Sequence, residues 1–166
     1  MKAVQFNDYE AFRIGMNIEK DGIEFYTEFA NNTKSPETKN IMLKLAEDEK
    51  EHLDLLEQLS REVESRYEGQ AISGDELIDK YLKSIVETGV FYDPKNLPAG
   101  SIKNLTDKEV LSIGIQTEKD SILFYEEAAR LSTNPSGKKA FERLVAEEKN
   151  HLVILKGRLE KIGYGS

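Results

Sequence analysis

The chain has 166 residues, of which 33% are charged and 39% are hydrophobic, and its formal net charge is −8. This acidic balance argues against a broad nucleic-acid surface, because phosphate contacts need clustered Lys and Arg. No apolar run is long enough to span a bilayer, the first residues lack the apolar stretch of a signal peptide, and cysteine is absent. We therefore predict a cytoplasmic protein of one domain, residues 1–166, with neither a nucleic-acid nor a membrane partner.

A first helical hairpin is predicted over residues 8–67. Asn7, followed three residues later by Glu10, is a helix-start pattern. The first helix is expected over 8–31, and Pro36 marks the start of a second over 37–67. Small and apolar residues recur every three or four positions along both, which is typical of helices in a bundle.

A long crossover is predicted over residues 68–106. It contains one short expected helix, roughly 75–88, and then a loop with Pro94 and Pro98. A connection of this length is expected between the second and third long helices of a bundle.

The second hairpin is predicted over residues 107–162. Thr106 and Glu109 form another capping pattern, and Pro135 separates helices expected over 107–131 and 136–162. Gly163 is a plausible stop. The fold class is therefore all-α, a four-helix bundle made of two hairpins.

The second hairpin repeats the first, without a gap, at an offset of 99 residues. The repeat aligns two Glu-x-x-His motifs that contain the only two histidines of the chain, and it aligns one further glutamate ahead of each motif. All lie on the apolar stripes of their helices. The six residues are Glu19, Glu49, His52, Glu118, Glu148 and His151.

This residue set predicts a two-metal carboxylate site. Glu and His three positions apart lie on one helix face, about 4.5 Å apart along the axis, so both reach one ion. Four carboxylates balance the charge of two divalent ions, and carboxylate with imidazole suits iron or manganese, with zinc also accepted. A lone Glu-x-x-His on a charged helix is usually a solvated pair. Its duplication on buried stripes favours ligation over that reading and over a metal-free bundle.

Four further residues are expected beside the metals. Tyr26 and Tyr125 fall two turns after Glu19 and Glu118, either as redox-active groups or as core aromatics that hydrogen-bond a carboxylate. Asp48 and Glu147 precede the motif glutamates and are predicted to pair across the bundle, Asp48 with His151 and Glu147 with His52. The alternative for both acids is a solvent-exposed position.

With these residues in place, the chain resembles the rubrerythrin-like members of the ferritin-like superfamily. The resemblance implies a ferritin-like bundle, a di-iron centre on the six residues, and tyrosines next to it. It also implies reduction of peroxide or O₂ and a homodimer. Rubrerythrins carry an additional glutamate where this chain has Ser121, so the symmetric ligand set is also similar to that of bacterioferritins. The position of their haem-binding methionine is Lys50 here, and no haem is expected.

Three redox functions remain open at this stage, beside a metal-free or zinc-bound structural bundle. The first is a di-iron peroxidase that takes electrons from an external donor such as a rubredoxin-like protein, since the chain has no cysteine for an iron–sulfur site of its own. The second is a ferroxidase or iron-handling protein. The third is an oxygenase of an organic substrate, whose pocket would be covered by Tyr92 and Leu97, while Phe91 is a candidate dimer contact.

Overall fold

The computed structural model describes residues 6–67, 77, 80, 84 and 102–163. The described part contains helices and no strand, as the sequence predicts. A single 3-10 turn, η1 (Ile102–Asn104), precedes the third long helix. The four long helices are α1 (Asp8–Asn32), α2 (Pro36–Tyr67), α4 (Asp107–Leu131) and α5 (Pro135–Gly163). None of them, in the described ranges, combines the length and the apolarity that a bilayer crossing requires.

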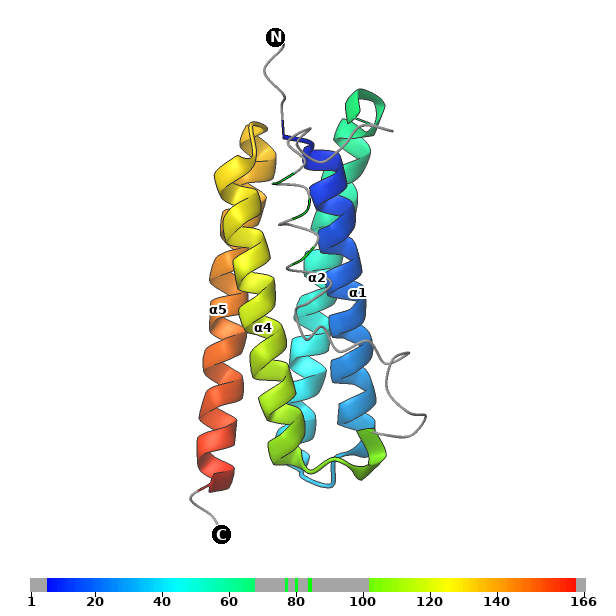
Figure 1. Cartoon of the computed structure of the whole chain (residues 1–166). Helices are drawn as coiled ribbons and strands as arrows, with labels where there is room; N and C mark the ends of the chain where they lie inside the picture. Colours follow the sequence, from blue (N-terminus) through cyan, green and yellow to red (C-terminus); the bar gives the residue numbers. More distant parts are fainter. Residues whose placement is uncertain (1–5, 68–76, 78–79, 81–83, 85–101, 164–166) are drawn as a thin grey trace.

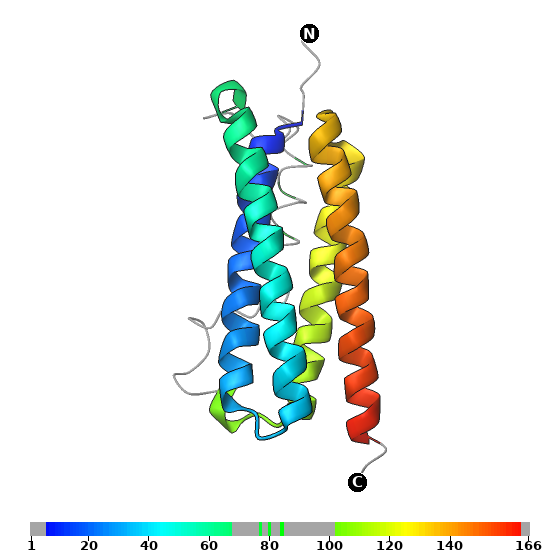
Figure 2. The ribbon, with the colours of Figure 1, turned by 180° about the vertical axis from the view of Figure 1, so that it is seen from behind.

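The four helices form one bundle of two antiparallel hairpins (Figure 1). α1 packs on α2 and α4 packs on α5, while α2 also contacts α5 and α1 contacts α4. Helices α2 and α4 run in the same direction in both views (Figures 1 and 2). α2 therefore ends at the opposite end of the bundle from the start of α4, which explains why a long segment separates the two hairpins.

Side-chain caps start α1 and α4, as predicted. The Asn7 side chain accepts a hydrogen bond from the Glu10 backbone N–H, at 3.2 Å. Thr106 and Glu109 bond reciprocally in a complete capping box. Each cap satisfies backbone donors that a helix start leaves without an intrahelical partner.

The predicted stripes form the buried core. On the stripes of the two second helices of the hairpins, Leu45 of α2 and Leu144 of α5 are fully buried, and Ile162, at the end of the α5 stripe, is half-buried. Phe12 and Phe141 are fully buried and bring α1 and α5 together, with ring centroids 5.2 Å apart. Burying one such aromatic side chain contributes about 2–3 kcal/mol by transfer from water. The glutamate and histidine positions interrupt this apolar core, so four buried acids need a physical explanation.

Several predictions lie outside the described residues. They are most of the crossover over 68–106, most of the short helix expected near 75–88, and the suggested contacts of Phe91, Tyr92 and Leu97. The structure therefore leaves these as predictions.

Candidate metal centre

The six predicted ligands meet inside the bundle in two overlapping groups. The ligand atoms of each group lie within 4.8 Å of one another, and every member is buried. Glu49 and Glu148 belong to both groups, which places one carboxylate from α2 and one from α5 between the two positions. The groups are Glu19, Glu49, His52 and Glu148, and Glu49, Glu118, Glu148 and His151.

Both imidazoles direct Nδ1 toward the carboxylates. His52 Nδ1 lies 3.3 Å from Glu49 Oε2 and 3.4 Å from Glu19 Oε2. His151 Nδ1 lies 3.0 Å from Glu148 Oε2 and 3.3 Å from Glu49 Oε1. The two rings stack with their centroids 5.5 Å apart. The Glu-x-x-His spacing thus puts one imidazole nitrogen of each motif at each group, as ligation of two ions requires.

The opposite nitrogens of the imidazoles face two other acids across the α2–α5 interface. His52 Nε2 lies 2.6 Å from Glu147 Oε2, and His151 Nε2 lies 3.5 Å from Asp48 Oδ2. This is the expected cross-pairing, and both acids are only partly exposed. When Nδ1 binds a metal ion, a carboxylate near Nε2 favours the tautomer that keeps its proton on Nε2.

The two tyrosines contact the glutamates of the cluster from α1 and α4. The Tyr26 hydroxyl donates to Glu118 Oε1, and the Tyr125 hydroxyl donates to Glu19 Oε1. Each hairpin therefore supplies the phenol for the other hairpin's glutamate. Both rings are essentially without solvent exposure, at 1% and 0%.

Three acids of the cluster, Glu19, Glu49 and Glu118, have strongly perturbed pKa values. Burial raises the pKa of Glu19 well above its usual range, and the charge of Glu49 raises it further. Burial and the charge of Glu148 do the same to the pKa of Glu118. Burial also raises the pKa of Glu49, but hydrogen bonds to Glu19 and His151 outweigh it and leave that pKa below its usual value. Protons on some carboxyls thus offset part of the buried negative charge.

The imidazoles and phenols of the site also have raised pKa values. Burial lowers the pKa of both imidazoles, but the attraction of the surrounding carboxylates outweighs it, so the pKa of His52 and of His151 is raised. Burial, followed by the neighbouring glutamate charges, raises the pKa of Tyr26 and of Tyr125 well above the usual phenol range. Both phenols therefore remain neutral donors.

The donor set fits a pair of divalent cations. Within the described part of the chain, two buried side-chain atoms of the cluster have no hydrogen-bond partner: Glu19 Oε2 and His52 Nδ1. They face each other at 3.4 Å. Buried polar atoms without partners are costly, and a cation between them satisfies both. Oxygen-rich coordination with one imidazole per ion suits iron or manganese.

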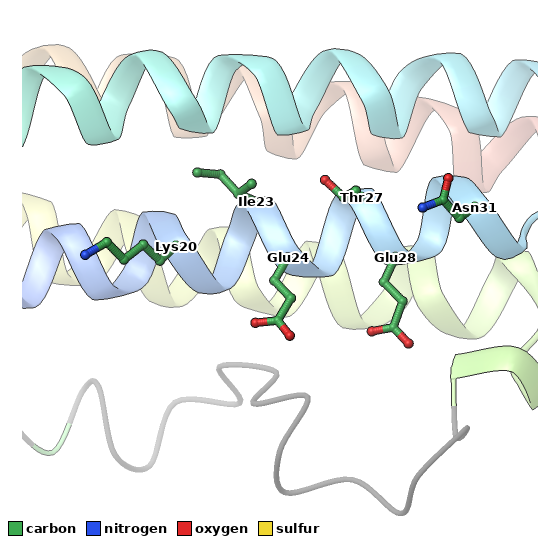
Figure 3. A pocket seen from close by; sticks show the side chains of 6 residues that line it. All are labelled: Lys20, Ile23, Glu24, Thr27, Glu28 and Asn31. Atoms are coloured by element: carbon green, nitrogen blue, oxygen red, sulfur yellow. The ribbon is translucent and has the colours of Figure 1, made fainter.

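A polar cavity of about 270 Å³ reaches the centre from the α2–α5 face. The outer edges of both histidines contribute to its wall, together with Lys44, Asp48, Glu51, Glu147 and Asn150. A wider hollow of about 500 Å³ lies on the outer face of α1. Figure 3 shows its lining, where Glu24 and Glu28 extend from the same edge of the helix. That hollow contains none of the six cluster residues, so of these two spaces between described residues only the α2–α5 cavity touches the centre.

Sequence reasoning missed two residues here, Lys44 and Arg143. Arg143 Nε donates to Glu147 Oε1 at 2.8 Å, and Lys44 donates to Asp48 Oδ1. Each cation lies one helical turn before the acid it binds, and the repeat aligns the two pairs. The signal was the i,i+4 spacing, which is common on solvated helix faces and so did not stand out.

The comparisons with known proteins agree with this geometry. A family model described as Rubrerythrin matches residues 10–159, which cover both hairpins and the segment between them. Comparison with curated proteins and comparison with solved structures gave no match. The chain therefore belongs to the rubrerythrin family of ferritin-like di-iron carboxylate proteins.

Proposed function

We propose that this protein is a di-iron oxidoreductase that reduces hydrogen peroxide with electrons from an external donor. The observation that carries the proposal is the paired arrangement of four buried carboxylates around two imidazole Nδ1 atoms, in a chain of the rubrerythrin family. We propose iron as the metal and peroxide as the oxidant, two choices that the sequence alone leaves open.

Each group of four ligands would hold one ion. Glu19 and His52 would serve the first position, Glu118 and His151 the second, and Glu49 and Glu148 would contribute to both. When bound, a ferrous pair supplies two electrons, the number that H₂O₂ needs, with two protons, to become two water molecules. Manganese or zinc fits the same donors, but zinc has no redox chemistry.

Neighbouring side chains hold the ligands in place. The Tyr26 and Tyr125 hydroxyls fix the two outer glutamates, Glu118 and Glu19, by hydrogen bonds. Their raised pKa keeps the proton on each phenol oxygen. Glu147 and Asp48 orient the imidazoles from the opposite side. Fixed ligands lower the reorganisation that accompanies a change of charge at the centre.

The tyrosines support two roles, and both predict the contacts described above. In one, the phenol only positions a carboxylate. In the other, Tyr26 or Tyr125 also supplies an electron. Substituting each with phenylalanine separates the roles: unchanged oxidation kinetics of the iron-loaded double variant would leave the positioning role alone.

A second candidate is iron oxidation, in which ferrous iron is the substrate. Ser121 favours it, because this buried position, one turn after Glu118, carries a glutamate in the rubrerythrins that the chain resembles. Gly22 is its counterpart on α1, and a Cβ there would lie 3.4 Å from Glu49. Because both positions carry small residues, neither half of the centre has an additional glutamate there. The two halves therefore match in their ligands, as in the symmetric sites of iron-storing relatives.

We propose an electron donor outside these 166 residues, either a rubredoxin-like carrier or a small molecule, because they contain no cysteine for an iron–sulfur site. We also propose a homodimer and a cytoplasmic location, as the family resemblance and the composition favour.

Anaerobic stopped-flow spectroscopy tests the proposal. Protein loaded with two ferrous ions per chain is mixed separately with H₂O₂ and with O₂. Faster oxidation by peroxide, with iron retained and reducible again in place, is the expected result. Faster oxidation by O₂, with iron released or accumulating beyond two per chain, would replace the peroxidase with the iron-handling function.

A further inference from the structure

The two halves of the centre are chemically unequal, although the repeat makes them equivalent in the fold. On one side Arg143 and Glu147 support His52, and on the other Lys44 and Asp48 support His151. Arginine presents a rigid, planar fork, whereas lysine presents a mobile point charge. The aligned acids also differ by one methylene, which changes how far each reaches toward its imidazole.

The distances follow this chemical difference. Glu147 contacts His52 Nε2 at 2.6 Å through one oxygen and accepts from Arg143 at 2.8 Å through the other. Asp48 binds Lys44 through Oδ1, and its other oxygen is 3.5 Å from His151 Nε2. The first imidazole is therefore held at hydrogen-bond distance and the second is not.

The inner nitrogens differ as well. His52 Nδ1 and Glu19 Oε2 have no hydrogen-bond partner among the described residues. A metal ion can therefore bind these two ligand atoms without first breaking a hydrogen bond. His151 Nδ1 already contacts Glu148 Oε2 at 3.0 Å. A cation at the second position must first displace that contact, which costs part of its binding free energy.

We infer that the two positions fill in order, with the His52 half binding the first metal ion and Arg143, acting through Glu147, as the residue that sets the difference. This inference rests on the proposed metal centre. Arg143 is a positioning residue, because it touches Glu147 and not the ligands. The second ion then binds more weakly at the His151 half.

Calorimetric titration of metal-free protein with Co(II), an ion that air does not readily oxidise, tests this order. Two steps of different affinity are expected. His151→Ala is expected to keep the tighter step, and His52→Ala is expected to lose it. Two equivalents bound with equal affinity would overturn the order alone, whereas no specific binding would overturn the metal centre as well.

Variants of the supporting residues test the role of Arg143. Loss of a group that orients a metal-bound histidine typically lowers metal affinity 10–100-fold. We therefore expect Arg143→Met to lower the affinity of the first binding step about tenfold. Arg143→Lys is expected to recover part of this affinity, and Lys44→Met is expected to lower the affinity of the second step alone. Arg61→Met is the matched control, since Arg61 forms an i,i+4 ion pair with Glu57 at 3.1 Å elsewhere on α2.

The visible absorption of bound Co(II) separates positioning from a general loss of stability. At one equivalent, Arg143→Met is expected to shift the ligand-field bands, while Arg61→Met leaves them unchanged. Unchanged affinity and bands in Arg143→Met would overturn the assignment.

Discussion

Removing the metal ions is expected to make the stability of this protein fall as pH rises. Burial and neighbouring charges raise the pKa of Glu19 and of Glu118 far above the value of 4.5 that applies in an unfolded chain. Above that value the folded protein keeps protons that the unfolded chain has released. Its free energy of unfolding must then decrease with pH. The raised pKa of His52 and of His151 acts in the same direction above 6.5, the unfolded value.

The magnitude follows from proton counting. Each proton held only by the folded state lowers the free energy of unfolding by about 1.4 kcal/mol per pH unit. In a series from about pH 5.5 to about pH 7.5, two glutamates that keep their protons in the folded state therefore lower it by roughly 3 kcal/mol per pH unit, a large share of the stability of an ordinary domain. The lowered pKa of Glu49 has the opposite sign, but its contribution changes only below 4.5.

Urea unfolding followed by circular dichroism, in chelator and over a pH series, measures this slope. Metal ions take the place of the protons, so the same series with Mn(II) is expected to show stability that rises with pH. The variant Glu19→Gln with Glu118→Gln is the control, because it keeps the shape of both side chains and removes the contribution of these two carboxyls to the slope below about pH 6.5, where the imidazoles do not yet contribute. A metal-free stability that is flat or rising over this range would refute the assignment of buried, protonated carboxyls.

Two further predictions concern packing around the centre. In metal-free protein, Tyr26→Phe and Tyr125→Phe are each expected to lower the free energy of unfolding by about 1–3 kcal/mol, because each leaves a buried carboxyl without its hydrogen-bond donor. Chemical unfolding measures this loss. A loss below the error of the measurement in both variants would contradict the hydrogen bonds. Gly15→Ala is expected to cost about 1–3 kcal/mol, because its Cβ would lie 2.9 Å from Leu56 Cδ1 and 3.3 Å from the Tyr125 ring. Gly157→Ala is the matched control, because a Cβ at that position would have no neighbouring atom within 4 Å. It is expected to raise the free energy of unfolding by about 0.5–1 kcal/mol in the same assay.

The repeat in the sequence predicted most of the candidate site. Helical spacing placed Glu49 and His52 on one face, and the duplicated motif placed a second pair opposite. The cross-contacts of Asp48 and Glu147 also followed, because adjacent helices bring residues before one motif to the histidine of the other. Periodicity is informative where the position of a side chain depends only on its own helix and on a symmetric neighbour.

Other features depend on details that periodicity does not carry. Asp8 has the position of an ordinary first-turn acid, yet it is fully buried and accepts from Ser132 at the far hairpin. The roles of Arg143 and Lys44 depend on whether the partly exposed acids, Glu147 and Asp48, turn toward the imidazoles. Water and the buried imidazole compete for each carboxylate, and sequence spacing does not reveal which of the two it contacts.

The metal content of purified variants tests the central claim most directly. After anaerobic reconstitution with Fe(II) and removal of excess ions, mass spectrometry of the wild-type protein is expected to show two iron ions per chain. Glu148→Ala removes a carboxylate common to both groups and is expected to fall below one ion per chain, whereas Glu142→Ala, at an exposed position on the same helix, is expected to keep two. Two ions retained by Glu148→Ala, or none bound by the wild-type protein, would contradict a di-iron centre on these six residues.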